Sequence, residues 1–165
     1  MSHLSHDAAG PLGKIPVGAE LGVSEWFTIT QDMISKFGAA TLDADPMHDD
    51  PDWAKEQGPY GSTIAYGFQT VGMLTRLMRS ALGEEVSLEP SAAGYPLNYG
   101  FDRLRLVAPV PCNSRIRGRF TLTDRTIDER DRIVQRVAAV IEIEGQARPA
   151  LVAEWLSVWV PIATA

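Results

Sequence analysis

The stretch "GFQTVGMLTRLMRSALG", Gly67 to Gly83, decides the fold class of this 165-residue chain. Its apolar residues recur at helical spacing, and the first charged residue in it is Arg76. A helix that is apolar almost all round is normally buried, so we expect a long helix in the protein interior. Arg76 and Arg79 suit the negative end of the helix dipole, and Gly83 suits the end of the helix.

The hydrophobic residues change to a period of two after Pro96, which indicates β-strands. Separated by turn-rich segments, three runs alternate between apolar and polar residues: 114–123, 132–144 and 150–160. Runs arranged in this way predict strands that pair with their sequence neighbours as antiparallel hairpins. A further strand is expected within residues 95–111, with an irregularity at Gly100–Arg103, where the alternation changes phase.

The first half of the chain predicts helices and loops. Ser24–Thr30 is a short β-prone run, and Thr30 is expected to cap the helix that follows it. A second short helix is expected over Asp50–Gln57. Because a sheet must cover one face, the long helix is its natural cover. We therefore expect an α+β architecture, a hotdog fold in which an antiparallel sheet of about five strands wraps the long central helix.

The length and composition are those of a single domain with a core of its own. We expect that domain over residues 19–165, after a flexible tail over residues 1–18 that lacks the pattern of a secretory signal. The formal net charge of −6 argues against binding to nucleic acid, and no apolar run is long enough to span a membrane. Cys112 is the only cysteine, which excludes an internal disulfide and fits a reducing, cytoplasmic compartment.

A second segment, "TLDADPMHDDPDWAKEQGPYGSTIAYGF" (Thr41–Phe68), gathers acidic residues around His48. A calcium loop that starts at Asp43 is excluded because Met47 and His48 take the positions of an oxygen ligand and a glycine. A zinc or iron site would need a second histidine or a cysteine nearby, so we expect no metal. The remaining acidic residues are expected to be helix caps, turn residues or solvated charges: Asp45, Asp49, Asp50 and Asp52.

Asp43 and His48 admit a more specific interpretation. A carboxylate and an imidazole five residues apart, with the rigid Pro46 between them, can converge on one water molecule as an acid–base pair. The glycine-rich turn that follows places Gly67 at the amino terminus of the long helix, where backbone N–H groups stabilise negative charge on a carbonyl oxygen. Alternatively, these glycines only form turns, and the spacing by itself leaves both interpretations open.

The motifs "LDADPMHDDPDWA", "GSTIAYGF" before the long helix, and "LNYGFDRLRLVAPVPCNSRIRG", taken together, resemble those of the MaoC-like hydratases. This family includes the R-specific enoyl-CoA hydratases and a NodN-like branch, and the resemblance extends from about Ser24 to Trp159. It implies that Asp43 and His48 are the catalytic pair. It also implies that the Gly67 N–H polarises a thioester carbonyl.

The resemblance further implies an activity and an assembly. Members hydrate trans-2-enoyl-CoA to (R)-3-hydroxyacyl-CoA as hydro-lyases of fatty acid metabolism, with no cofactor other than the coenzyme A of the thioester substrate. They commonly form homodimers or larger homo-oligomers, with the acyl group at the subunit boundary. This chain has Tyr66 where the family usually has histidine before the glycine. We therefore expect Tyr66, together with Gly67 and Asn98, to affect substrate binding.

Two other functions stay open on sequence grounds. An acyl-CoA thioesterase of the same fold often carries a carboxylate on its central helix, and residues 68–82 contain none. A non-catalytic acyl-binding subunit would keep the fold without turnover. Neither the acyl chain length nor the carrier, coenzyme A or acyl-carrier protein, follows from sequence. The arginines of the run 114–123 are expected on the solvent face of the sheet, although one of them, or Arg103 or Arg105, is an alternative partner for coenzyme A phosphates: Arg115, Arg117 and Arg119.

Overall fold

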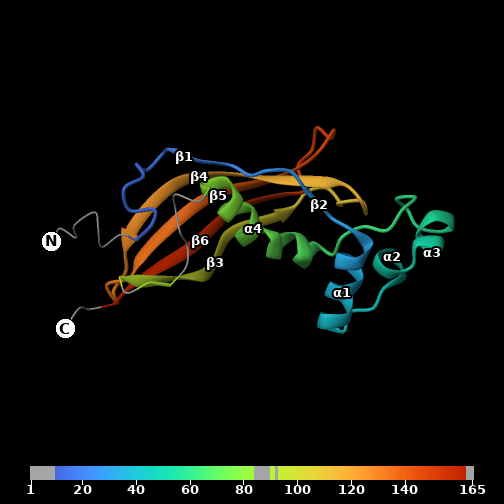
Figure 1. Ribbon diagram of the computed structural model, residues 1–165, viewed down its shortest axis with the longest axis horizontal. Coiled ribbons are helices and arrows are strands. Elements are labelled where there is room, and N and C mark those ends of the chain that lie inside the picture. Colours follow the sequence, from blue (N-terminus) through green and yellow to red (C-terminus); the bar gives the residue numbers. More distant parts are fainter. Residues whose placement is uncertain (1–9, 84–89, 92, 163–165) are drawn as a thin grey trace.

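The computed structural model describes residues 10–83, 90–91 and 93–162. Antiparallel strands form one six-stranded sheet that curves around a single long helix, and three further helices form a small lobe beyond one end of it (Figure 1). The expected α+β hotdog fold is confirmed. The sheet has one strand more than the five expected, because residues 20–23 also pair with it.

In the described part of the chain, two short strands come first, the four helices follow, and the four long strands come last. Their bounds are β1 Glu20–Val23, β2 Phe27–Thr28, α1 Gln31–Thr41, α2 Pro46–Asp49, α3 Pro51–Glu56, α4 Gly67–Leu82, β3 Gly94–Leu106, β4 Arg115–Ile127, β5 Ile133–Ile143 and β6 Leu151–Pro161. The strand order in the sheet is β1-β4-β5-β6-β3, with β2 also paired to β4. The predicted hairpins β4–β5 and β5–β6 are both present.

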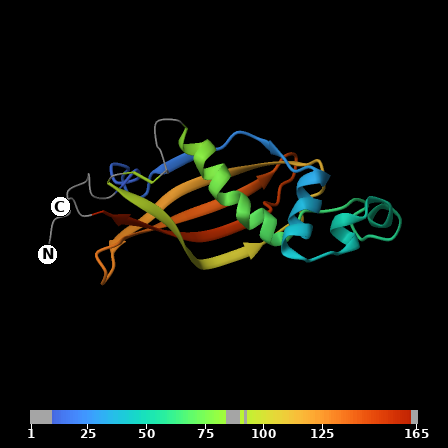
Figure 2. The ribbon, with the colours of Figure 1, turned by 60° about the horizontal axis from the view of Figure 1, so that its bottom comes forward.

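The long helix α4 crosses the strands of the sheet obliquely (Figure 2). Its hydrophobic residues that face the sheet are at most 8% exposed: Met73, Leu74, Leu77 and Met78. Each such side chain stabilises the fold by about 1.5–3 kcal/mol on leaving water. The expectation that α4 is buried almost all round is wrong for one stripe, because Phe68 is 79% exposed and Gly72 and Arg79 on the same face are also exposed.

The inner face of the sheet supplies the other half of the core. In β4 the predicted alternation is confirmed, since Ile116, Phe120 and Leu122 are completely buried. Gly118 lies between them and gives α4 room, because a Cβ at this position would be only 3.0 Å from the Cβ of Leu77. The small residue therefore sets how closely the helix approaches the sheet.

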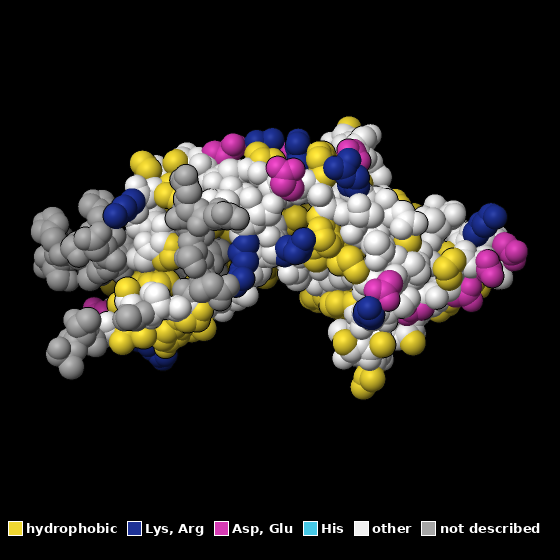
Figure 3. Space-filling model, viewed as in Figure 1, with side chains coloured by type: hydrophobic (Ala, Val, Ile, Leu, Met, Phe, Trp, Pro, Cys, Tyr) yellow, Lys and Arg dark blue, Asp and Glu magenta, His cyan; other side chains and the backbone are white. Residues whose placement is uncertain are grey.

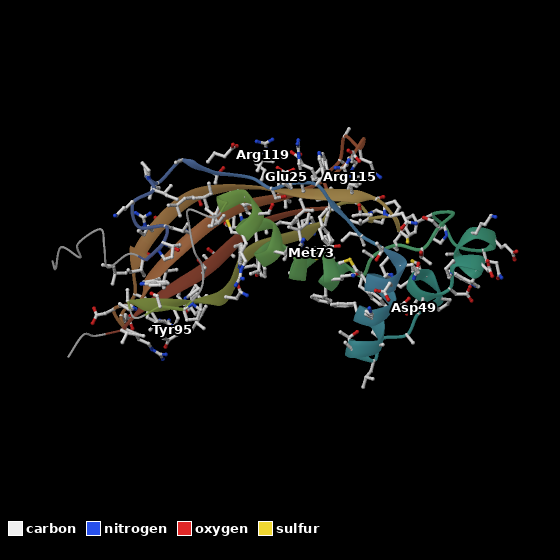
Figure 4. The ribbon with its side chains drawn as sticks, in the orientation of Figure 1. Glu25, Asp49, Met73, Tyr95, Arg115 and Arg119 are labelled. Atoms are coloured by element: carbon white, nitrogen blue, oxygen red, sulfur yellow. The ribbon has the colours of Figure 1, made fainter. Side chains whose placement is uncertain are left out.

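The outer face of β4 carries the predicted row of arginines. Arg115 pairs with Glu144 at 2.9 Å, and Arg117 pairs with Glu142 at 2.6 Å. Arg119 completes the row, and Figure 4 shows Arg115 and Arg119 on the convex side of the sheet, away from α4. These partly exposed ion pairs each contribute at most about 1 kcal/mol. The expectation that these arginines form a solvent face is confirmed.

Strand β3 lies at one edge of the sheet, where it pairs with β6. The register shifts between Asn98 and Gly100 and again between Phe101 and Arg103, which confirms the irregularity predicted from the phase change. Gly100 has a φ of 155°, a conformation that glycine adopts without steric cost.

Part of the predicted tail is packed against the sheet. Leu12 is 4% exposed and belongs to the core, and Arg125 donates hydrogen bonds to the carbonyl oxygens of Leu12 and Ile15. Residues 10–18 are thus held by an apolar contact and by a partly buried guanidinium, while His3 and His6 lie outside the described residues. In the described part of the chain, no helix combines the length and apolar character needed to cross a membrane.

Candidate active site

The loop that carries Asp43 and His48 is shaped by helix ends. Helix α1 ends at Leu42 in the left-handed conformation, with φ of 58°, so the chain turns sharply before Asp43. Asp45 then caps α2 by accepting a hydrogen bond from the Met47 N–H at 2.8 Å. Asp50 caps α3 in the same way, which confirms the interpretation of Asp50 as a helix cap, and Asp45, expected in the turn before Pro46, is a cap as well.

His48 is held from two directions. Its Nδ1 lies 2.7 Å from the carbonyl oxygen of Ile64. Because a carbonyl oxygen can only accept, Nδ1 carries the proton in the neutral imidazole and Nε2 keeps a free lone pair. The His48 carbonyl accepts a hydrogen bond from Gln31 Nε2 at 2.8 Å, and Gln31 in turn accepts one from the Thr63 hydroxyl. Both the ring and the backbone of His48 are therefore fixed.

Asp43 and His48 both contact Tyr66, Asp43 through its backbone carbonyl and His48 through its ring. The Tyr66 hydroxyl donates to the backbone carbonyl of Asp43 at 2.6 Å, and its ring stacks on the His48 ring with 3.8 Å between centroids. The side chain of Asp43 is exposed to solvent, and His48 is half-buried. The two predicted catalytic residues thus share one supporting side chain, which lies next to Gly67 in sequence.

Asp49 also contacts Tyr66, whose hydroxyl lies 2.6 Å from Asp49 Oδ2. Figure 4 shows Asp49 in the small lobe, beside α1. The expectation that Asp49 is a cap or a solvated charge is wrong, because a tertiary contact withdraws its carboxylate from water. Burial, followed by the hydrogen bond to Asp49, raises the pKa of Tyr66, so the phenol keeps its proton and remains a donor.

Gly67 begins α4, directly after Tyr66 at the N-cap position. The first N–H groups of a helix have no partner within the helix, so the Gly67 N–H is available to a ligand. A Cβ on Gly67 would meet Cδ1 of Leu106, the end of a side chain that is 46% exposed, so β3 passes close to the start of α4. The structure therefore places the predicted oxyanion donor one residue from the tyrosine that contacts His48.

Asn98 borders two of the cavities that lie along α4. The first, of about 320 Å³, is lined by Val71, Gly72, Leu74, Thr75, Asn98, Tyr99, Gly100, Phe101 and Trp155. The second, of about 220 Å³, lies toward the far end of α4 and shares Thr75, Asn98 and Trp155 with the first. Together they form a largely apolar tract beside the helix. Asp43 and His48 line neither cavity, so Asn98 is not brought together with them.

Sequence reasoning missed three residues that support the candidate site: Gln31, Gly38 and Asp49. Gln31 holds the backbone of His48, and Asp49 shares the Tyr66 hydroxyl proton with the Asp43 carbonyl. Gly38 lies in the interior of α1, where glycine costs about 0.5–1 kcal/mol relative to alanine. That unfavourable glycine was the one signal available from sequence, because it indicates a close contact at this position.

Comparison with known proteins indicates the same family as the hotdog fold and the sequence motifs. The family model described as "MaoC like domain" matches residues 14–146. Nodulation protein N of Rhizobium meliloti (strain 1021) is 38% identical over 142 residues, covering 86% of this chain and 85% of that protein. The 3-hydroxyacyl-thioester dehydratase Z of Mycobacterium tuberculosis (strain H37Rv) is 37% identical over 140 residues, covering 83% and 86% of the two chains.

A solved structure extends the comparison to three dimensions. The MaoC-like dehydratase from Rhodospirillum rubrum superposes with a TM-score of 0.70 at 17% identity, covering 93% of this chain and 98% of that one. At this identity the likeness concerns the fold, whereas the family model and the two relatives concern most of the sequence. The chain belongs to the MaoC-like domain family.

Proposed function

We propose that this protein catalyses the reversible hydration of a trans-2-enoyl thioester to the (R)-3-hydroxyacyl thioester. Asp43 and His48 act as the acid–base pair, and the Gly67 N–H binds the thioester carbonyl oxygen. The observation that carries the proposal is the fixed orientation of His48: Nδ1 is engaged by Ile64, which leaves Nε2 free to act on a water molecule. The name of the related 3-hydroxyacyl-thioester dehydratase Z supports the same class of substrate.

The reaction adds the oxygen of water to the β-carbon and a proton to the α-carbon. With the carbonyl oxygen at the Gly67 N–H, negative charge that develops on this oxygen is stabilised and the β-carbon becomes electrophilic. Water loses a proton to the Asp43–His48 pair as its oxygen bonds to the β-carbon, and the pair returns a proton to the α-carbon. One oxyanion donor of this kind lowers the barrier by about 3 kcal/mol.

The apolar tract beside α4 supports an acyl substrate. It is bordered by Val71 and Gly72, which follow Gly67 by about one turn of the helix. An acyl chain whose carbonyl is held at Gly67 would therefore enter the tract directly. Most of its lining is hydrophobic, which suits a hydrocarbon chain and excludes water from it.

A second copy of the chain is part of the proposal. Strand β3 is an edge strand that exposes large hydrophobic side chains at 36–54%: Tyr95, Leu97, Tyr99, Phe101 and Leu106. Edge strands of this length and apolarity are normally covered. Figure 3 shows hydrophobic side chains gathered in the indentation between the sheet and the small lobe. Since Asp43 and Phe68 are also exposed, a homodimer through β3 would supply the missing wall of the site.

The activity is tested with purified protein and crotonyl-CoA. We expect the absorbance of the enoyl thioester to fall without release of free thiol, because α4 carries no carboxylate to serve a thioesterase. Asp43→Asn and His48→Gln should each lower hydration at least about a hundredfold with an unchanged circular dichroism spectrum. Full activity in the double variant would refute the assignment of the pair. Release of thiol at the same rate as loss of the enoyl signal would favour the thioesterase.

A further inference from the structure

Tyr66 joins the loop that carries Asp43 and His48 to the start of α4. Its backbone takes the N-cap position, and its carbonyl oxygen accepts the Thr70 N–H at 3.0 Å. Its side chain is 4% exposed and contacts the loop instead of solvent. Backbone and side chain of one residue thus hold the two halves of the proposed site.

The Tyr66 hydroxyl fixes both ends of the segment 43–49. At one end it donates to the Asp43 carbonyl, and at the other it lies equally close, at 2.6 Å, to Asp49 Oδ2. Most of α2, including His48, lies between these two points. Asp49 Oδ1 is buried without a hydrogen-bond partner in the described part of the chain, so the tyrosine hydroxyl is an important contact of this carboxylate.

The Tyr66 ring restrains the imidazole itself. It stacks on His48 with an interplanar angle of 28°, and Phe37 packs against Tyr66 with 5.3 Å between ring centroids. With Nδ1 already bound to the Ile64 carbonyl, contact on the ring face leaves the imidazole little freedom to tilt. The direction of Nε2 is set by these two contacts.

Gly38 provides the space that the hydroxyl occupies. A Cβ on Gly38 would overlap the Tyr66 hydroxyl oxygen and would lie 2.9 Å from Asp49 Oδ2. The contact explains why a glycine lies in the interior of α1 despite its low helix propensity. Gly38, Asp49 and Tyr66 therefore pack tightly against one another beside the loop that carries Asp43 and His48.

We propose that Tyr66 is a positioning residue of the active site, whose hydroxyl and ring hold Asp43 and His48 at a fixed place relative to the Gly67 N–H. The inference rests on the proposed hydratase function for its kinetic consequence. The part of the inference that concerns the position of the His48 imidazole can be measured without substrate. Asp49 and Gly38 serve the same arrangement, one as the acceptor for the hydroxyl and the other by leaving it room.

Tyr66→Phe removes the hydroxyl and keeps the ring. Since misplacement of a catalytic group by about 1 Å can cost a hundredfold in rate, we expect kcat for crotonyl-CoA to fall about 10–100-fold. KM should change less than about twofold, because the hydroxyl is buried against Asp43 and Asp49. Tyr60→Phe makes the same chemical change at a tyrosine that is 51% exposed, and it should leave both constants unchanged.

A second pair of variants tests the interlocking with Gly38. Gly38→Ala should lower kcat as Tyr66→Phe does, because the added methyl group displaces the hydroxyl. In the Tyr66→Phe background the oxygen is absent, so the further loss caused by Gly38→Ala should be several-fold smaller than its loss in the wild type. Equal losses in the two backgrounds would overturn the proposal.

The imidazole is followed by nitrogen-15 NMR, with the His48 signals assigned by comparison with His48→Gln. We expect the wild type to show a proton on Nδ1 in the neutral ring, and Tyr66→Phe to shift the His48 resonances and alter the pH dependence of kcat. Unchanged resonances together with unchanged kcat would overturn the inference. If the wild type hydrates no enoyl thioester, the proposed function fails, and the NMR comparison of Tyr66→Phe with Tyr60→Phe still decides whether Tyr66 positions His48.

Discussion

Thr75 lies where the two cavities beside α4 meet, and its replacement by phenylalanine should divide the apolar tract. The residue is half-buried on α4, so a larger side chain can be accommodated there at a cost of about 1–3 kcal/mol. We predict that Thr75→Phe shortens the acyl chain that the enzyme accepts while it leaves the chemistry at Gly67 intact.

The size of the effect follows from the geometry of the helix. Thr75 comes eight residues after Gly67, which is about 12 Å along α4. An extended chain advances about 1.2 Å per bond, so Thr75 lies about ten carbons from the thioester carbonyl. A twelve-carbon substrate would lose the burial of about two methylene groups at about 0.8 kcal/mol each. That loss corresponds to a decrease in kcat/KM of about 15-fold.

The assay compares crotonyl-CoA with trans-2-dodecenoyl-CoA at equal enzyme concentration. Thr75→Phe should hydrate crotonyl-CoA within about twofold of the wild type and should lose the longer substrate selectively. Thr75→Val, which has nearly the same size as threonine, is the matched control and should retain both substrates. Equal losses for the two substrates, or none for the longer one, would refute the placement of the acyl chain along α4.

Three further predictions concern stability and assembly. Because burial and Asp49 raise the pKa of Tyr66, the folded chain keeps the phenol proton at a pH where the unfolded chain has lost it. Its stability relative to Tyr66→Phe is therefore present below about pH 10 and should fall by about 1.4 kcal/mol per pH unit above it; a constant difference in urea unfolding between about pH 9 and pH 11 would contradict this. Leu77→Ala, at a residue that is 1% exposed, should lower the free energy of unfolding by about 2–5 kcal/mol, and a loss below about 1 kcal/mol would show that the core relaxes around the cavity. Phe101→Asp on β3 should convert the proposed dimer to single chains in sedimentation, whereas Ile127→Asp on β4, at a residue that is 46% exposed against 38% for Phe101, should not; a wild type that sediments as a single chain would refute the dimer.

The elements that sequence predicted are those determined by local patterns. The apolar periodicity of α4, the alternation in β4 and the phase change at Gly100 all depend on neighbours within a few residues. The caps Thr30 and Asp50 are local in the same sense. The strand β1 was missed because its four residues pair with a strand that lies about a hundred positions away.

The sequence pointed to the principal residues of the candidate site, but not to the residues that hold them in place. Asp43, His48 and Gly67 belong to motifs that are visible in the sequence, although their roles stay proposals. The contacts of Tyr66 with Asp49 and of Gln31 with His48 join segments 17 residues apart. No spacing rule relates such residues, because packing between α1, α2 and the start of α4 brings them together.

The two edges of the sheet differ in a way that limits how many copies can assemble. One edge offers a 13-residue strand, β3, whereas the opposite edge ends in β1 and β2, with four and two residues. If two copies joined through β3, the one long edge found among the described residues of each copy would be consumed, and the short strands would offer little to a third copy. Assembly through β3 would then stop after a single step, which would prevent growth into fibrils.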